Sequence, residues 1–339
     1  MDREKTSVPS ATDARLVAGE KAVPVPLTAI GNQAMARLAA GGTRSALTVA
    51  RNGRQTTSDD PDVERYNESV KEQATFRGTQ YSKDPHQPSS GIGLFGATLS
   101  GGTLKITIKC KFEFTNSWWL EYPRASEKDR KWQPGEADAW KATFMSQVKS
   151  AWSGKHTFHC QKDWWEDVTA TTAIEVVEVT EGAHFDCKVQ KIPPKEFRTS
   201  SVSSPIFGGF FGGGSADFDS NDINSVQKPG GNQRASVHEA GHMLGLDDEY
   251  GDPGEEVDHS KIVEDAGGGK VVRGADGRIM SGGEDVGTAH GATFLEVLKE
   301  MTKLEWGNAP KTPRKPIPAG AMGDFNVPPP LKPGDAVPV

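Results

Sequence analysis

The sequence predicts an α+β fold, in which a β-sheet is covered by a helix and the two ends of the chain are disordered. Three observations support this prediction. Residues 104 to 114 alternate apolar and polar side chains with the period of a half-buried strand. Residues 134 to 154 place apolar side chains at steps of four, which is the period of an amphipathic helix. Pro, Gly, Ser and Thr are concentrated near both ends and in one central segment.

The predicted elements follow one another as a strand, a helix and then several strands. The inward positions of the first strand are Leu104, Ile106, Ile108, Cys110, Phe112 and Phe114. The helix carries its apolar stripe on Trp140, Phe144, Val148 and Trp152 and stops at Gly154. Short runs rich in β-branched or aromatic residues predict further strands in "HTFHC", "TAIEVVEVT" and "AHFDCKVQKI".

The two ends of the chain are predicted to be poorly structured, which leaves residues 91–307 as the folded domain. Residues 1–90 form a mostly disordered leader with a short helix near 28–40, because their composition cannot bury enough apolar surface. Residues 308–339 are Pro-rich, which predicts an extended and largely unpacked tail. The chain begins without the apolar stretch of a signal peptide, and no window has the length of a membrane span.

Charge and cysteine content exclude several classes of function. The formal net charge of −7 argues against a nucleic-acid-binding surface, which needs a basic patch. Cys110, Cys160 and Cys187 stand far apart without CxxC spacing, so neither a zinc ribbon nor a disulfide framework is indicated. Buried free thiols are the expected state, and one disulfide with one spare thiol is the alternative.

A Gly-rich segment, "IFGGFFGGGSADFDSNDINS", spans residues 206–225. Its glycines argue against a regular element, unless the backbone must bend or pass close to another group. The segment lacks the Gly-Lys-Ser/Thr ending of a phosphate-binding loop. We therefore expect a structural loop or the rim of a cleft.

The stretch "QRASVHEAGHMLGL" carries the chemistry that the sequence predicts. Helical spacing places His238 and His242 on one face, one turn apart, so that both imidazoles can bind one metal ion. Glu239 follows the first histidine and can take a proton from a water molecule at the metal. This is the HExxH pattern of zinc hydrolases, and a catalytic zinc keeps one position for water, whose pKa it lowers to about 7.

Asp248 is the predicted third ligand. Gly245 can adopt the left-handed conformation, end the helix and turn the chain so that Asp248 returns to the metal. The extended pattern HExxHxxGxxD arises by chance in only about one sequence in ten thousand. The rival third ligands are Asp247, Glu249 and His259.

These residues resemble the metzincin clan of zinc peptidases, and the aspartate in the third position resembles the snapalysin-like variant. The resemblance implies a mixed twisted sheet with a backing helix, an active-site helix, a methionine-bearing turn and a C-terminal helix. Met280 in "ADGRIMSGG" would supply that turn as a packing floor rather than a ligand. The apolar stripe of "ATFLEVLKEMTKLEW" would form the final helix. His290 is expected to be a second-shell or solvated histidine.

The leader segment "AIGNQAMARLAAGG" and the form "HEAGHMLGLDDEY" are similar to segments of proteins carried by extracellular contractile injection systems. The resemblance implies a toxin or effector that is made in the cytoplasm without a signal peptide and exported as cargo. Its partners would then be a protein or peptide substrate and the inner tube or loading machinery of the particle.

The favoured function is a zinc-dependent endopeptidase in which His238, His242 and Asp248 bind Zn²⁺ and Glu239 is the general base. The alternative is a structural or adaptor component of the injection particle, in which zinc only staples the fold. A zinc hydrolase of non-peptide amides is a third possibility.

Overall fold

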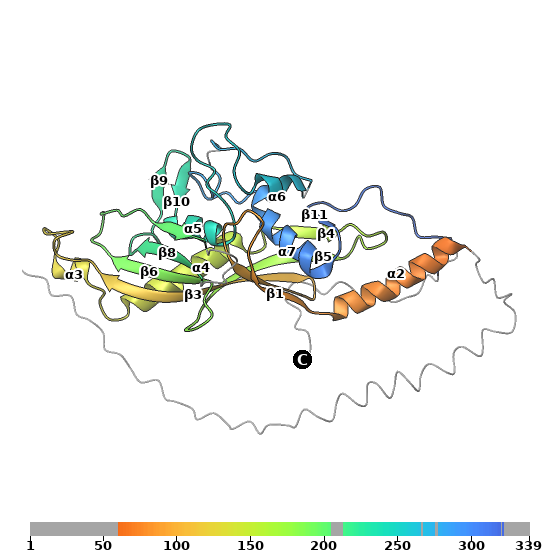
Figure 1. Cartoon of the computed structure of the whole chain (residues 1–339), viewed down its shortest axis with the longest axis horizontal. Helices are drawn as coiled ribbons and strands as arrows, with labels where there is room; N and C mark the ends of the chain where they lie inside the picture. Colours follow the sequence, from red (N-terminus) through yellow and green to blue (C-terminus); the bar gives the residue numbers. More distant parts are fainter. Residues whose placement is uncertain (1–59, 205–212, 266, 275–276, 320, 322–339) are drawn as a thin grey trace, which may run out of the picture. The chain divides into compact units, whose positions relative to one another are not determined.

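The computed structural model describes residues 60–204, 213–265, 267–274, 277–319 and 321. These residues form a mixed α+β structure built on one large sheet (Figure 1). The helix predicted near residues 28–40 lies outside the described residues, as do most positions of the predicted tail. No described helix has both the length and the apolar character that crossing a membrane requires.

The sheet is mixed and twisted, and its strands follow the order β11-β4-β5-β3-β6-β8-β7. β3 runs parallel to both β5 and β6, and β6 runs parallel to β8, whereas β4, β7 and β11 each pair antiparallel with a neighbour. The bounds are β3 Thr103–Asn116, β4 Thr157–Cys160, β5 Thr169–Glu178, β6 Phe185–Lys191, β7 Ser201–Ser203, β8 Gly214–Asp219 and β11 Trp306–Gly307.

The alternating stretch around residues 104 to 114 forms β3, as predicted. Leu104, Ile106, Ile108 and Cys110 are fully buried, while the intervening positions are partly exposed or exposed. The first half of β3 pairs with β5 and with β2 (Phe95–Ser100), and its second half pairs with β6. β2 also pairs with β1 (Tyr81–His86). The predicted strands 156–160, 172–180 and 183–192 correspond to β4, β5 and β6.

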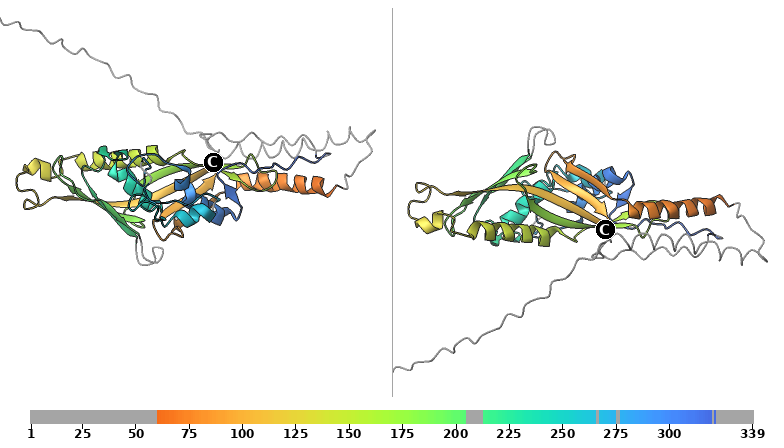
Figure 2. Two further views of the ribbon diagram at one scale, coloured as in Figure 1. Left: turned by 90° about the horizontal axis from the view of Figure 1, so that it is seen from above. Right: turned by 90° about the horizontal axis from the view of Figure 1, so that it is seen from below.

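Helix α4 (Glu136–Trp152) packs along one face of the sheet, as the views in Figure 2 show. All four residues of its predicted stripe are buried, and their exposed fractions do not exceed 2%. The ring of Phe144 lies 5.9 Å from that of Phe112 in β3 and 5.4 Å from that of Phe218 in β8. Burying each large apolar side chain contributes about 1.5–3 kcal/mol, so this stripe anchors the helix to the sheet.

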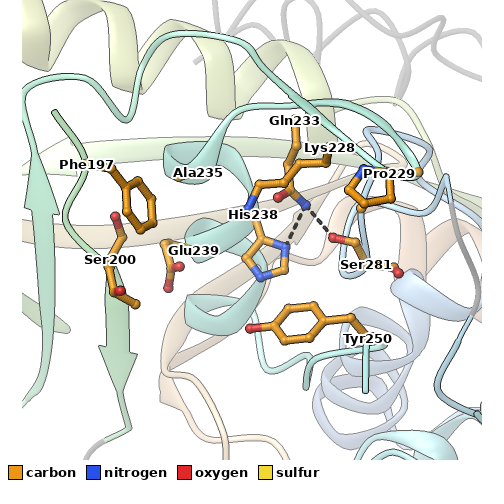
Figure 3. A pocket seen from close by; sticks show the side chains of 13 residues that line it. Phe197, Ser200, Lys228, Pro229, Gln233, Ala235, His238, Glu239, Tyr250 and Ser281 are labelled. Carbon is orange, nitrogen blue, oxygen red and sulfur yellow. Dashed lines mark hydrogen bonds between the residues drawn. The ribbon is translucent and has the colours of Figure 1, made fainter. Parts of the chain in front are cut away.

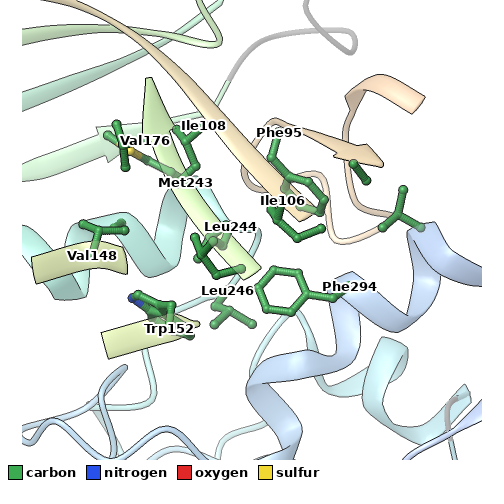
Figure 4. Packing of buried hydrophobic residues seen from close by; sticks show 14 of the residues in the cluster. Phe95, Ile106, Ile108, Val148, Trp152, Val176, Met243, Leu244, Leu246 and Phe294 are labelled. Atoms are coloured by element: carbon green, nitrogen blue, oxygen red, sulfur yellow. The ribbon is translucent and has the colours of Figure 1, made fainter. Parts of the chain in front are cut away.

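A second group of helices follows β8 along the chain. They are α5 (Ala235–Met243), α6 (Ser260–Asp265), the 3₁₀ turn η2 (Thr288–Gly291) and α7 (Ala292–Thr302). Met243, Leu244 and Leu246, at the end of α5, pack with strand residues and with Trp152 and Phe294 (Figure 4). The end of α5 is thus part of the main core, which fixes the helix that carries the HExxH pattern.

The predicted disorder of residues 1–90 is wrong for the part that is described. Residues 61–78 form helix α2 (Pro61–Gly78), and β1 follows it. Asp60 caps the helix by accepting from the Asp62 N–H at 2.9 Å, and Pro61 occupies the first turn. Phe76 packs its ring 5.3 Å from that of Trp165, and Gln73 donates to the Trp164 carbonyl at 3.1 Å. The helix has little apolar periodicity of its own, so its sequence alone does not predict that it folds against the rest of the domain.

The Gly-rich segment also differs from its prediction. Residues 206–212 lie outside the described residues, but residues 214–219 form β8, which pairs with β6 and β7. A Cβ atom at Gly214 would lie 2.5 Å from the Ser203 carbonyl oxygen and 2.5 Å from the Phe185 ring. The glycine therefore allows a close approach inside a strand instead of breaking it.

The predicted tail is not unpacked over its first part. Pro316 accepts from the Trp164 indole N–H at 3.1 Å, Ala309 accepts from the Gln161 amide at 2.9 Å, and Lys311 forms an ion pair with Asp163. Residues 309–316 therefore extend the folded body past the predicted boundary at residue 307. Cys110, Cys160 and Cys187 are free and buried, as expected.

Candidate metal centre

Helix α5 is short, and tertiary contacts hold both of its ends. At its start the Ser236 N–H donates to the Asp222 carbonyl at 3.1 Å, since no side chain caps the helix. At its end Gly245 adopts φ +95°, and a Cβ there would lie 2.5 Å from Pro88. A left-handed residue ends the helix and turns the chain, which confirms the predicted role of Gly245.

His238 and His242 project from the same face of α5. Their ring centroids are 5.0 Å apart and the rings are nearly perpendicular, with an interplanar angle of 88°. His238 is 5% exposed, and the His242 side chain is 14% exposed. The two imidazoles are therefore neighbours in a largely dry environment, as the spacing predicts.

Backbone carbonyls determine which nitrogen of each imidazole is free. Nδ1 of His238 lies 2.7 Å from the Ile279 carbonyl oxygen, and Nδ1 of His242 lies 2.8 Å from that of Leu246. A carbonyl oxygen only accepts, so both Nδ1 atoms carry hydrogen. Gln233 Nε2 is 3.2 Å from Nδ1 of His238, but its hydrogens have the Ser281 and Ile279 carbonyls as acceptors. In a neutral imidazole of this tautomer the lone pair is on Nε2, which is the arrangement of a metal-binding histidine.

Asp248 brings a carboxylate to these two nitrogens. Its Oδ1 atom lies 3.1 Å from Nε2 of His238 and 3.2 Å from Nε2 of His242. Burial alone would raise the pKa of Asp248, but its hydrogen bonds with His238 and His242 hold that pKa well below the usual range. Burial would likewise lower the pKa of His242, but Asp248 and Glu239 raise it above its ordinary value. The predicted ligand set of His238, His242 and Asp248 thus converges in space.

This convergence requires a cation. Two lone pairs and one carboxylate oxygen at 3.1 to 3.2 Å would repel one another unless a proton or a metal ion lies among them. Zinc bonds of about 2.0–2.1 Å in tetrahedral geometry separate neighbouring ligand atoms by roughly 3.3 Å. The two distances from Asp248 Oδ1 to the imidazole nitrogens are therefore compatible with zinc.

Glu239 lies beside the same group. Its ligand atom and those of His238 and His242 all lie within 4.8 Å of one another. The Oε2 atom of Glu239 is buried and has no hydrogen-bond partner among the described residues. Burial raises the pKa of Glu239, although His242 and His238 oppose that effect. Asp248 is the better candidate for the third ligand than Glu239, because Asp248 contacts both Nε2 atoms while Glu239 keeps an unpaired oxygen.

A cavity of about 320 Å³ opens at this site (Figure 3). Glu239 and His238 line it, together with Phe197, Ser200, Lys228 and Tyr250. The Tyr250 ring lies 6.0 Å from that of His238, nearly parallel to it. Burial raises the pKa of Tyr250, and the nearby carboxylates of Asp248 and Glu239 add to that effect, so the phenol remains protonated. Tyr250 stands two residues after Asp248, where no spacing rule predicts a role for it.

Met280 packs beneath α5. A Cβ at Gly241 would overlap the Sδ atom of Met280 and lie 3.0 Å from its Cε. Met280 is fully buried, and its neighbour Ile279 provides the carbonyl that orients His238. Met280 thus packs against the helix one residue before His242.

The rival third ligands bind elsewhere. Asp247 Oδ2 pairs with Arg273 at 2.9 Å and accepts from the Asp258 N–H at 3.2 Å. Glu249 contacts His259 and His290 in a separate cluster. Burial would raise the pKa of Glu249, but the nearby His259 and His290 lower it to about 2, so Glu249 is ionised at neutral pH. His290 is fully buried against Glu249, so the solvated histidine that was one of its two predicted states is wrong.

Comparisons of this chain with protein-family models, with curated proteins and with solved structures found no match.

Proposed function

We propose that this protein is a zinc-dependent endopeptidase with a metzincin-like site. One observation carries the proposal. Oδ1 of Asp248 lies 3.1 Å from Nε2 of His238 and 3.2 Å from Nε2 of His242, and the unpaired Oε2 atom of Glu239 lies beside this group. A structural zinc site has four protein ligands and is closed. Here three candidate ligands are joined by a general base and a cavity, which favours catalysis over a purely structural zinc.

The donor set fits zinc chemically as well as geometrically. Two neutral imidazoles and one carboxylate are ligands that Zn²⁺ accepts. Each imidazole also donates its Nδ1–H to a backbone carbonyl, which raises the basicity of the ring. When bound, zinc would supply Lewis acidity, which polarises a peptide carbonyl and lowers the pKa of water.

The residues of the chain would perform the proton transfers and the charge stabilisation. Glu239 takes the proton of the attacking water and returns it to the nitrogen of the leaving amine as the C–N bond breaks. Its raised pKa brings that carboxyl closer to the working pH of a general base. Tyr250 lines the same cavity with its phenol protonated, so it is the candidate donor to the oxygen on which negative charge develops.

Other features support a metzincin-like arrangement. Among the described strands, β7 pairs only with β8, so it is the edge strand of the sheet on the side of the cavity. Ser200, the residue before β7, lines that cavity. An extended substrate peptide could therefore add to this edge. Met280 under α5, followed by α7, repeats the order that the resemblance implies.

Metal analysis combined with proteolysis tests the proposal. The full-length chain should contain one zinc ion and should cleave casein or a peptide library. A chelator should abolish this cleavage, and added zinc should restore it. Cleavage that survives complete removal of the metal would refute the proposal. Bound zinc without cleavage of any peptide would instead favour the structural or adaptor function.

We further propose a role as toxin or effector cargo of a contractile injection system. This proposal rests on the resemblance of the leader segment, which lies outside the described residues, and of the segment around His238 and His242. Loading of a reporter protein fused to residues 1–59, compared with the reporter alone, would test it.

A further inference from the structure

The carboxylate of Glu249, one residue after Asp248, lies in a second cluster of polar groups. Its Oε1 atom is 3.2 Å from Nε2 of His290 and 3.4 Å from Nε2 of His259. Its Oε2 atom is 3.0 Å from Nε of Arg278. Glu249, His259 and His290 are fully buried, whereas the Arg278 side chain is 28% exposed. Four groups of this kind could be mistaken for a second metal site.

The hydrogen bonds of the two imidazoles argue against metal binding in this cluster. Nδ1 of His259 accepts from the Asp247 N–H at 3.1 Å, and Nδ1 of His290 accepts from the Gly287 N–H at 2.9 Å. A neutral imidazole whose Nδ1 accepts carries its hydrogen on Nε2. Both Nε2 atoms therefore carry hydrogen and have no lone pair for a metal. The Nε2–H of His290 donates to Oε1 of Glu249 at 3.2 Å, whereas that of His259 lies near Glu249 without a hydrogen-bond partner among the described residues. This is the opposite tautomer from that of the two histidines on α5.

The backbone beside this side chain is held as well. Arg273 Nη1 donates to the Asp248 carbonyl at 2.7 Å. The Glu249 N–H donates to the Met280 carbonyl at 2.7 Å, and the Glu249 carbonyl accepts from the Gly274 N–H at 2.7 Å. A shift of Asp248 along the chain would have to break several of these contacts together.

We propose that Glu249 is a positioning residue for the third metal ligand. Its buried cluster with His259, His290 and Arg278 anchors the chain at residue 249. The Asp248 carboxylate is therefore held beside His238 and His242 in the absence of metal. A buried charged cluster adds little net stability compared with apolar side chains of equal volume, which favours a geometric role over a stabilising one. This inference rests on the metal centre proposed above.

A double-mutant cycle on zinc affinity tests the proposal. Glu249→Gln keeps the side-chain volume and loses the charge, and it should weaken zinc binding by about 10- to 100-fold, the range for losing a partner of a metal ligand. In an Asp248→Ala background the same substitution should have no further effect, because Glu249 acts through Asp248. Zinc affinity is measured by competition with a chelating dye, on proteins whose circular dichroism matches the wild type.

Glu256→Gln is the matched control. It breaks an ion pair with Lys270, which is 3.0 Å away, in the same region of the chain and should leave zinc affinity unchanged. If Glu249→Gln does not fold, Arg278→Gln should show the same coupling with a smaller effect, because Arg278 is partly exposed.

Equal zinc affinity of Glu249→Gln and wild type would overturn the proposal, and so would an undiminished effect in the Asp248→Ala background. A wild-type protein that binds no zinc would instead refute the metal centre itself. Both outcomes are judged by zinc affinity and not by proteolysis, so failure of the positioning role and failure of the metal centre can be told apart.

Discussion

Met280 occupies the space next to Gly241 in which any larger residue would place its Cβ atom. The contact joins the turn around Met280 to the helix that carries both imidazoles. Trp152 closes the same space from the other side, since one of its ring carbons would lie 3.2 Å from that Cβ. The glycine in the middle of the HExxH pattern is therefore required by packing and not by the backbone conformation of the helix.

The first prediction concerns Gly241→Ala. In an exposed helix this substitution would stabilise by about 1 kcal/mol. Here the added methyl must displace the buried thioether, so we expect a loss of about 1–3 kcal/mol in the free energy of unfolding, measured with urea on the zinc-free protein. In a Met280→Ala background the loss should disappear, because the smaller side chain leaves room. A stabilised Gly241→Ala protein would contradict the packing.

The second prediction concerns the proton transfer by Glu239. The Glu239→Gln protein should bind zinc with nearly wild-type affinity, because Glu239 is not one of the three ligands we assign. Its kcat should fall by a factor of about 10² to 10⁴, which is the contribution of a general base. Metal content and peptide cleavage are measured on the same preparation. Cleavage at the wild-type rate by the zinc-loaded variant would disprove this role.

The third prediction separates catalysis from substrate binding at Tyr250. Removing the phenol hydroxyl in Tyr250→Phe should lower kcat by about 10²-fold and change KM little, since a donor to the developing negative charge acts mainly in the transition state. Zinc affinity should not change. Tyr122→Phe is the control, because Tyr122 does not line the cavity. If Tyr250→Phe raised KM at constant kcat, Tyr250 would only bind substrate.

The fourth prediction concerns the dependence of stability on pH and uses His156, which is not one of the proposed metal ligands. Burial, with a contribution from His290, lowers the pKa of His156 to about 4. Its Nε2 atom is buried without a hydrogen-bond partner among the described residues. Below about pH 6.5 the His156 imidazole binds a proton in the unfolded chain but not in the folded protein. Stability therefore falls as the solution is acidified from pH 6.5 to 4.

The loss attributable to His156 should approach about 1.4 kcal/mol per pH unit in that window. Wild type and His156→Gln are compared by urea unfolding in the presence of a chelator. The stability difference between them should shift against the wild type as the pH falls. Parallel pH profiles would show that His156 is protonated in the folded protein as readily as in the unfolded one.

The local sequence pattern is sufficient to predict the elements whose apolar residues recur with a regular period. The alternation of β3 and the steps of four in α4 lie in the sequence itself, because a strand or an amphipathic helix exposes its own periodicity. Helix α2 and strand β8 were not predictable in this way. α2 packs against Trp164 and Trp165, about 90 residues away along the chain. In β8, Phe185 and Ser203 leave no room for a Cβ atom at position 214, which explains a glycine inside a strand.

The imidazole pair and the turn that follows it are readable from the sequence, because one helical turn separates His238 from His242 and a glycine at position 245 allows the left-handed conformation. The different surroundings of Asp248 and Glu249 are not readable in this way, because the side chains that pair with each come from distant segments. The tertiary structure also decided the tautomers, through carbonyl oxygens such as that of Ile279, 41 residues from His238. Helical spacing is local and can be read from a sequence, whereas a lone pair becomes available to a metal only when the chain folds a hydrogen-bond acceptor against the opposite side of the ring.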